Sequence, residues 1–419
     1  MKFFRFLCFL FITLAFFPLK TVSMSLEECI AQVLKQHPTL KKSQYALKQA
    51  KENINQKKAS FYPEIALSTQ YSQQYNETSQ KRSENYGLSL SVNELLFNGL
   101  QRYYAYQQSL LSNNLAQEDF KKTRFDLIFL VKELAYSLNL YKKQVEVLKK
   151  VITRRQEDLV IIKLKYNGGK ESLVSVQEME ADVLDAQVSL LEKEEQINLI
   201  TEILNLMREK PANEPLTITL ASLPQENSQG SAFIQQALTN SYQAKRLEIL
   251  LDMQECNIKS IQGEYFPRIS LYGGVGLSEN QFFPSKKNWN FGLSLNLQLF
   301  SGFLTQAKKQ EAHYKKLELK EEQKALEIQL KTDIKKILTA LKILQEKIIV
   351  WQQKYQAALN SYELTRLSYQ QGKLSYQWLK QKESELFNLE LSKESLLYEM
   401  RVKNAEIEKI TQGEEIAEK

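Results

Sequence analysis

The feature that most constrains the fold is a short stretch in the second half of the chain. Apolar residues occupy every odd position from Trp289 to Leu299, and Asn, Gly, Ser, Asn and Gln stand between them. This two-residue period predicts a β-strand whose two faces meet different surroundings. At Phe300-Ser301-Gly302 the alternation stops and a long run of helical periodicity begins. A strand with small polar residues on one face, feeding such a helix, suits the wall of a pore better than a packed core.

The same arrangement occurs in the first half of the chain, where residues 85–92 alternate and the run closes in Leu-Phe-Asn-Gly at 96–99. The two halves align at an offset of about 204 residues. Ser-Phe-Tyr-Pro-Glu-Ile at 60–65 matches Glu-Tyr-Phe-Pro-Arg-Ile at 264–269. The chain is therefore an internal duplication, and each half is predicted to contain a helix, two strands, a long helix and a further helix.

The first residues of the chain have the pattern of a secretory signal. Lys2 and Arg5 precede an apolar run at 6–17, and small residues at 21–23 suit cleavage. A retained anchor helix is the alternative. No other stretch reaches the roughly 18 apolar residues that a transmembrane helix needs. We expect a signal peptide at 1–23, a first repeat at 24–207, a linker at 208–230, a second repeat at 231–411 and a C-terminal tail at 412–419.

Strands are expected at about residues 63–75, 85–97, 267–278 and 288–300. About 12 residues per tilted strand can cross the hydrocarbon layer of a bilayer, and one apolar and one polar face are typical of a membrane β-barrel. Aromatic residues gather at the helix-side ends, either as an interfacial girdle or as core residues of a domain junction. Because about eight strands are needed to close a barrel, four must be pooled among copies, and three chains would supply twelve.

The long helical segments have a strict 3.5-residue period, which predicts left-handed coiled coils. The first series runs from Leu127 to Ile162, with Arg155 as its only interruption, and the second runs from Leu330 to Tyr355. Partner series follow each of them, at 176–204 and 379–407. The long helical runs have about 67 residues each and would extend roughly 100 Å, which suits a projection across a periplasm.

Together, the two repeats, the Phe-Tyr-Pro and Tyr-Phe-Pro motifs, the Leu-Phe-x-Gly junctions and the Tyr-x-x-Gly-Lys turns resemble the TolC family of outer-membrane efflux proteins. The similarity covers essentially the whole chain. It implies a mainly α-helical fold with a membrane β-barrel, in which a homotrimer forms a twelve-stranded β-barrel and a long coiled-coil α-barrel. It also implies a location in the outer membrane of a Gram-negative bacterium, embedded in its lipid, with a long periplasmic extension.

The resemblance further implies that the chain docks with a periplasmic adaptor (membrane fusion) protein and an inner-membrane transporter. We therefore expect the channel or exit duct of a tripartite efflux or type I secretion system, acting as a passive conduit. The alternative is a trimeric coiled-coil adhesin or periplasmic scaffold with a small membrane anchor, which gives no reason for two halves to match strand for strand. A drug, a metal ion and a secreted polypeptide all stay open as cargo.

Candidate gate residues lie at and after the two turns between long helices: Gly169, Lys170, Ser175, Glu178, Gly372, Lys373, Trp378 and Gln381. The best-known relatives carry two aspartates after the second turn, which form a constricting ring. Because Trp378 and Gln381 occupy those positions here, the ring cannot be transferred. Trp378 is a candidate steric constriction, or it packs between helices. Lys170 and Lys373 are either adaptor contacts or solvated charges.

Candidate strand–helix junction residues share positions that flank the strands in both repeats: Pro63, Phe97, Gly99, Pro267, Phe300 and Gly302. We expect no catalytic residue, cofactor or metal site. His37 and His313 stand in unmatched positions and are too few for a histidine-rich metal site. The basic and acidic residues are interspersed, which disfavours nucleic-acid binding. Cys29 and Cys256 could pair in an oxidising compartment, and the sequence leaves this open.

Overall fold

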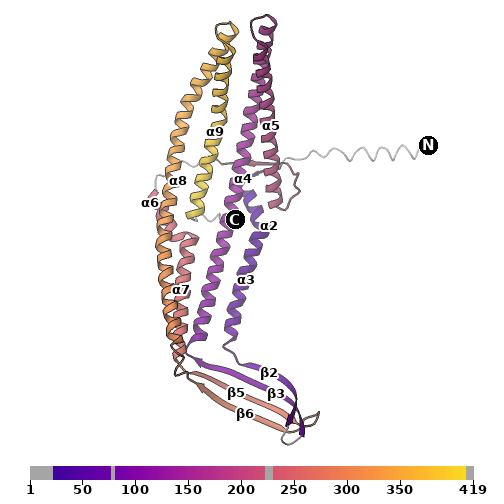
Figure 1. The fold of residues 1–419 in the computed structure, drawn as a ribbon, viewed down its shortest axis with the longest axis vertical. Helices are drawn as coiled ribbons and strands as arrows, with labels where there is room; N and C mark the ends of the chain where they lie inside the picture. The colour runs from indigo at the N-terminus through magenta and orange to yellow at the C-terminus, as the bar shows by residue number, and fades with distance from the viewer. Residues whose placement is uncertain (1–21, 77–80, 222–229, 412–419) are drawn as a thin grey trace, which may run out of the picture. The chain divides into compact units, whose positions relative to one another are not determined.

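A computed structural model describes residues 22–76, 81–221 and 230–411 (Figure 1). Most of the expected signal peptide and the whole C-terminal tail lie outside the described residues. The chain divides into two compact units, one formed by Met1–Lys41, Thr123–Ala237 and Leu330–Lys419 and the other by Lys42–Lys122 and Leu238–Gln329. Each unit therefore takes chain from both halves of the duplication, so the sequence repeats do not coincide with the compact units.

The second unit contains a four-stranded antiparallel sheet with the strand order β2-β3-β5-β6 (Figure 1). The strands are β2 (Glu64–Asn76), β3 (Lys81–Asn98), β5 (Arg268–Glu279) and β6 (Lys287–Asn296). Each half of the chain supplies one hairpin, and the β3–β5 pairing joins the two. Strand β6 ends before the expected boundary near residue 300, because Asn296 already stands opposite the first residue of β5.

The strand register separates an apolar face from a polar face, as the alternation predicts. On one face Leu67, Leu90, Val275 and Trp289 stand in one row across the four strands. This face is uncovered in the chain, since Leu67 is 69% and Trp289 is 80% exposed. On the opposite face the hydroxyl groups of Ser68 and Ser89 lie 2.8 Å apart, and further serine, asparagine and glycine residues continue the row.

Two helices of 67 residues each follow the strands, α4 (Gln101–Asn167) and α8 (Leu304–Gln370), as the two long periodic runs predict. Both contribute residues to each compact unit. In the part of the chain that the structure describes, no helix combines the length and apolar character that crossing a bilayer requires. The other helices are α2 (Leu26–Gln36), α3 (Pro38–Ala59), α5 (Leu173–Met207), α6 (Gly230–Asn240), α7 (Tyr242–Gln262), the short 3₁₀ helix η1 (Gly263–Tyr265) and α9 (Tyr376–Thr411).

The first unit begins with strand β1 (Val22–Ser25), which pairs in parallel with β4 (Leu216–Thr219) from the expected linker. Two residues that we assigned to the signal peptide, 22 and 23, thus belong to a strand because the linker supplies its partner. Ser25 and Glu28 form a capping box at the start of α2. The His-Pro pair at 37–38 separates α2 from α3, because proline cannot continue the hydrogen bonds of the preceding helix.

Buried apolar side chains of α4, α5, α8 and α9 form one core near the ends of these helices, within the first unit. Its fully or nearly fully buried members are Ile162, Val176, Met179, Ala358, Tyr362, Tyr369, Tyr376, Leu379 and Leu386. Five of these nine residues belong to the apolar series that predict coiled coils, whereas Ala358, Tyr362, Tyr369 and Tyr376 lie outside those series. Three tyrosines bring hydroxyl groups into it, and each hydroxyl requires a polar partner.

Candidate functional site

Both helical hairpins of the first unit end in the same glycine-dependent turn. The N–H of Lys170 donates to the carbonyl of Lys165 at 2.8 Å, and the N–H of Lys373 donates to the carbonyl of Ser368 at 2.9 Å. Each turn contains one glycine with a positive φ, which is +67° at Gly169 and +77° at Gly372. An added Cβ would meet nothing within 4 Å at either position, so the left-handed backbone alone demands glycine.

The other candidate gate residues occupy different environments and do not form one site. Ser175 is buried, and its hydroxyl donates to Glu171 at 3.0 Å. Glu178 accepts a hydrogen bond from Gln377 at 3.3 Å and lies 3.7 Å from the Lys380 ammonium group. The Trp378 side chain is 53% exposed, so it is not packed between helices of its own chain. The remaining members, Lys170, Lys373 and Gln381, are exposed.

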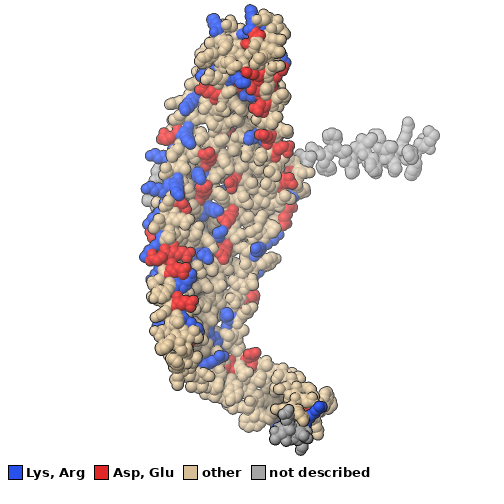
Figure 2. Space-filling model, viewed as in Figure 1, with Lys and Arg blue, Asp and Glu red and all other residues tan. Residues whose placement is uncertain are grey.

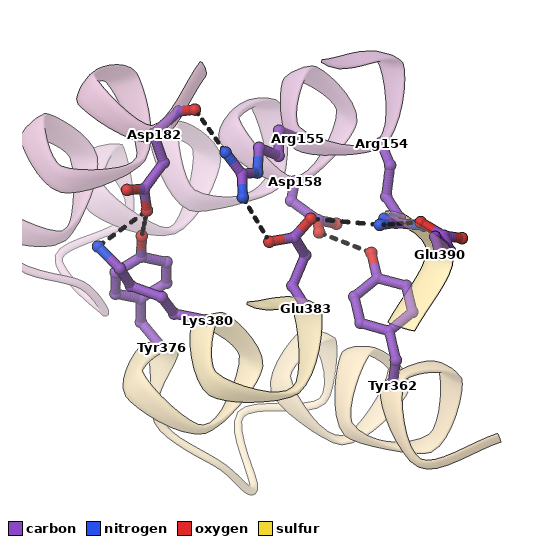
Figure 3. A network of polar contacts seen from close by, with 9 residues as sticks. All are labelled: Arg154, Arg155, Asp158, Asp182, Tyr362, Tyr376, Lys380, Glu383 and Glu390. Carbon is purple, nitrogen blue, oxygen red and sulfur yellow. Dashed lines mark hydrogen bonds and ion pairs between the residues drawn. The ribbon is translucent and has the colours of Figure 1, made fainter. Parts of the chain in front are cut away.

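A network of buried charges crosses the four helices behind these turns (Figure 3). Its centre is Arg155 on α4, which is only 6% exposed. The guanidinium of Arg155 donates to the Glu383 carboxylate on α9 at 3.0 Å and to the backbone carbonyl of Asp182 on α5 at 2.7 Å. Arg155 therefore connects three helices, and its charge is neutralised where water does not reach it.

The adjacent Arg154 contacts α9 at two levels. Its guanidinium donates to both oxygens of Glu390, at 3.2 and 3.1 Å, and to Glu383 at 3.3 Å. The group also lies 5.2 Å from the ring centre of Tyr362 on α8. Arg154, Arg155, Glu383 and Glu390 thus form a compact charge cluster. The bidentate contact of Arg154 with Glu390 suits the planar guanidinium group, whose paired N–H groups match the two carboxylate oxygens.

Asp158, one turn further along α4, holds α8. Its carboxylate is fully buried and accepts a hydrogen bond from the Tyr362 hydroxyl at 2.8 Å and one from Arg366 at 2.7 Å. Burial raises the pKa of Asp158, although Tyr362 and Arg366 oppose that shift. Burial also raises the pKa of the Tyr362 hydroxyl, and the neighbouring Asp158 charge adds to the effect. The tyrosine therefore stays a neutral donor, and the aspartate is the single acceptor shared by both α8 residues.

A third set of contacts lies nearer the turns and joins α5 to α9. The Lys380 ammonium group lies 2.8 Å from the Asp182 carboxylate, and the Tyr376 hydroxyl donates to the same carboxylate at 3.4 Å. Tyr369 on α8 donates to Glu171, beside the first turn, at 2.9 Å. Every tyrosine hydroxyl in the core thus has an acidic partner on the other hairpin, so the two hairpins are locked to each other.

Part of this network has a sequence signal that our site prediction did not use. Arg155 is the single interruption in the apolar series of α4, and Glu383 fills the position between Leu379 and Leu386 where that series expects an apolar residue. Opposite charges at two such gaps indicate a buried pair. Asp158 has no such signal. It lies beside the periodic position Leu159, where an aspartate is equally typical of a solvent-exposed helix face.

The two strand–helix junctions differ in how closely the backbone packs. Gly99 has a φ of +65°, and a Cβ there would lie 2.0 Å from the carbonyl oxygen of Gly263. Gly302 has nearly the same φ, +63°, and nothing lies within 4 Å of its Cβ position. The next residues, Leu100 and Phe303, also have positive φ, which the sequence did not predict. Both junctions are therefore tight left-handed turns, but only the first is a close approach of two backbones.

Aromatic pairs and prolines flank these turns. Phe97 packs edge-on against Phe266 with ring centres 6.5 Å apart, and Phe300 packs edge-on against Phe303 at 5.5 Å. Pro63 and Pro267 each stand directly before a strand, β2 and β5 respectively. Pro63, Pro267 and Phe97 thus lie at strand ends, whereas Phe300 and Gly302 follow the end of β6 at Asn296 by four and six residues.

Within the described residues, no cluster of three His, Cys, Asp or Glu side chains has a metal-binding arrangement. Cys29 and Cys256 are both free thiols. The polar network consists of ion pairs and tyrosine hydrogen bonds between helices. These contacts hold the ends of the four helices α4, α5, α8 and α9 together.

A duplicated chain of paired long helices, with an antiparallel sheet that has one apolar and one polar face, defines the class of outer-membrane channel proteins with TolC-like architecture. The family model described as outer membrane efflux protein matches residues 29–205 and 233–411. The chain belongs to this outer membrane efflux protein family, which is one of channel proteins rather than enzymes. It is an outer-membrane efflux channel.

Solved structures of similar fold support the assignment of the architecture. The outer membrane protein VceC from Vibrio cholerae superimposes with a TM-score of 0.80 at 16% identity, over 93% of this chain and 96% of that chain. The CmeC outer membrane channel from Campylobacter jejuni gives 0.80 at 16% identity, over 93% and 87%. A membrane protein from Pseudomonas aeruginosa gives 0.81 at 15% identity, over 92% and 90%. No curated protein matches the sequence.

Proposed function

We propose that the protein is the exit duct of a tripartite efflux or type I secretion system and acts as a passive conduit. Three copies form the duct, which extends into the periplasm and meets a periplasmic adaptor protein that couples it to an inner-membrane transporter. The transporter supplies the energy, and the duct supplies a water-filled path through the outer membrane. The chain catalyses no reaction in this scheme and needs no cofactor.

The observation that carries the proposal is the sheet with two open edges. Strand β2 pairs only with β3, and β6 pairs only with β5, among the described residues. An exposed apolar face suits lipid, but unpaired strand edges do not, because each unpaired backbone group there costs several kcal/mol. Joining β6 of one copy to β2 of the next removes both edges, and three copies give a closed sheet of twelve strands.

The duplication also suggests the register of that joint. Within the chain, Leu90 of β3 stands opposite Val275 of β5. The repeat equivalents of these residues are Leu293 on β6 and Tyr71 on β2, and both belong to the apolar face. We therefore place Leu293 of one copy opposite Tyr71 of the next copy, so that the pairing between copies repeats the pairing within one.

The helices of the first unit offer a second pair of matching surfaces. On α5, the exposed apolar residues Leu184, Val188 and Leu191 share a helix face with acidic residues nearby. Between α8 and α9, an apolar groove beside Trp351 is rimmed by three lysines and one acid, so its rim is net basic: Lys342, Lys347, Lys354 and Glu346. Apolar complementarity and opposite charge favour packing of α5 from one copy against α8 of the next.

The gate in this scheme is the end of the two hairpins. The buried network that links Asp158 to Tyr362 and Arg366 keeps α8 against α4, and its release would let the hairpin ends separate. Trp378 is the candidate constriction. Trp378 and Gln381 of the second repeat correspond to Ser175 and Glu178 of the first repeat. At the turns, Lys170 and Lys373 are candidate adaptor contacts beside Gly169 and Gly372.

The proposal is tested by cross-linking through the expected joint. In a background with Cys29 and Cys256 replaced by serine, Leu293→Cys combined with Tyr71→Cys is expected to give a covalent trimer under mild oxidation. The control combines Leu293→Cys with Gln70→Cys, which moves one thiol to the other face of the sheet.

The same purified trimer is expected to conduct ions in planar lipid bilayers. A protein that is monomeric in detergent and does not conduct would overturn the duct. A trimer that forms but does not conduct would favour the adhesin or scaffold alternative.

A further inference from the structure

The charged residues of the four strands lie only at the strand ends. The strands contain Glu64, Lys81, Arg82, Glu84, Glu94, Arg268, Glu279 and Lys287 as their charged members. Residues 65–76, 85–93, 269–278 and 288–296 contain none. Figure 2 shows the same pattern on the face in view, where the sheet is tan between its ends while blue and red side chains alternate along the helices.

Only two of these charges belong to the polar face at the helix end of the sheet. Glu64 stands opposite Asn93, which stands opposite Tyr272. Tyr272 is on the polar face, because its hydroxyl lies 2.5 Å from the Cβ position of Gly292. Arg268 lies four residues before Tyr272 on the same unbroken strand and so shares its face.

Of the remaining charges, Lys81 stands opposite Asn76 at the loop end of the polar face, and the others follow the apolar face. Glu94 alternates with the polar Asn93, and its carboxylate pairs with Arg102 at 3.4 Å. Glu279 stands opposite Tyr86, whose ring packs against Tyr71 on the apolar face. Lys287 stands opposite Leu277 on that face. The polar face thus has a wall of hydroxyl and amide groups, with one acid and one base at its helix end.

These two charges occupy equivalent positions in the two repeats. Glu64 is the central residue of Pro-Glu-Ile, and Arg268 is the central residue of Pro-Arg-Ile. Both side chains are exposed. Their backbones are about 10 Å apart across the sheet and about 13 Å apart along the strands. No ion pair joins either of them to another described residue. In a trimer the six equivalent positions would alternate between Glu and Arg.

We propose that Glu64 and Arg268 form an alternating ring of six charges that sets the ion selectivity of the strand-lined part of the path. The inference rests on the proposed duct, in which the polar face lines the water. A lipid-surrounded wall of low dielectric constant strengthens the field of each exposed charge on ions that pass it. Because the two signs balance, the wild-type ring has no net preference, and removal of either sign leaves three like charges.

The test measures reversal potentials in planar bilayers under a KCl gradient. Arg268→Gln is expected to raise the permeability ratio of potassium to chloride by about twofold or more, and Glu64→Gln is expected to lower it by a similar factor. The exchange variant Glu64→Arg with Arg268→Glu restores the balance and is expected to behave like the wild type. Lys287→Gln removes the same charge from the apolar face and serves as the matched control.

The salt dependence separates a ring of exposed charges from a change in pore shape. Both shifts should be large near 0.1 M salt, where the screening length is about 10 Å, and small near 1 M, where it is about 3 Å. Conducting trimers whose selectivity is unchanged in both single variants would overturn the ring while leaving the duct intact. Shifts of the same sign in both variants would overturn it as well. If one single variant does not assemble, the other and the exchange variant still decide the outcome.

Discussion

Arg155 on α4 donates a hydrogen bond to Glu383 on α9 at 3.0 Å, and both side chains are buried. Two buried charges stabilise a structure only as a pair, because the loss of one partner leaves the other without compensation. Arg155→Met is therefore expected to destabilise the first unit by about 3 kcal/mol, the lower end of the range for a broken buried pair, since Arg154 still contacts Glu383.

The double variant Arg155→Met with Glu383→Leu is expected to recover most of this loss, because an apolar pair of similar size fits the surrounding core. Arg154 keeps its bidentate contact with Glu390 in that protein. Apparent melting temperatures of the wild type, both single variants and the double variant measure the coupling. A double variant no more stable than the weaker single variant would contradict the pairing.

Asp158→Asn is expected to increase the fraction of time that the channel spends in a larger conducting state. The substitution keeps the shape of the side chain but removes the charge that pairs with Arg366. Single-channel recording in planar bilayers measures the change. Glu157→Gln is the control, since Glu157 contacts the same arginine at 2.9 Å from an exposed position and such surface pairs contribute little. Equal effects of the two variants would argue against Asp158 as the lock.

Gly99→Ala is expected to reduce the yield of folded protein far more than Gly302→Ala. Both residues have positive φ, which costs roughly 1 kcal/mol for an alanine. Only at Gly99 would the new methyl group also collide with a backbone, that of Gly263. Melting temperature and the amount of assembled protein in the membrane fraction measure the difference. Similar losses in the two variants would mean that the turn conformation alone matters.

His37 is expected to make the stability of the first unit depend on pH. Burial lowers the pKa of His37, and its Nδ1 accepts the N–H of Thr39 at 3.2 Å, which requires an unprotonated nitrogen. The folded state therefore binds this proton less readily than the unfolded state. The stability contribution is present above the ordinary pKa near 6.5 and is lost as the pH falls through the lower folded value.

His37→Asn keeps an acceptor for the Thr39 N–H but does not titrate in this range. Melting temperatures measured between neutral and mildly acidic pH should therefore fall less in the variant than in the wild type. An identical pH profile for both proteins would exclude His37 as the source of the dependence.

Elements with strong periodicity could be predicted from the sequence, and local geometry could not. The alternation at residues 289–299 identified a strand with unlike faces, and the two long apolar series identified α4 and α8. The end of β6 at Asn296 could not be read from that alternation, since it is set by where β5 begins. The positive φ of Leu100 and Phe303 likewise has no sequence signal, because nothing in either side chain favours that conformation.

The two turns between the long helices were predicted from the sequence, but the polar network behind them was not, and the gate role of the candidate residues stays a prediction. The glycines of both turns were identified by the repeated Tyr-x-x-Gly-Lys motif, and the positive φ found at both positions explains why glycine stands there. Trp378 and Gln381 were chosen by their alignment with related proteins, and their role stays a prediction. The buried ion pairs were missed because a charge in a heptad series was treated as an interruption, whereas Arg155 and Glu383 neutralise each other between helices.

The pairing of β3 with β5 has a consequence for the biogenesis of the protein. During synthesis β3 leaves the ribosome long before its partner strand β5 exists, so the first repeat alone carries a strand with an open edge. Such edges are templates for aggregation. One edge of each hairpin is therefore covered only when both repeats of the chain are present, so a truncated first repeat would keep an open edge.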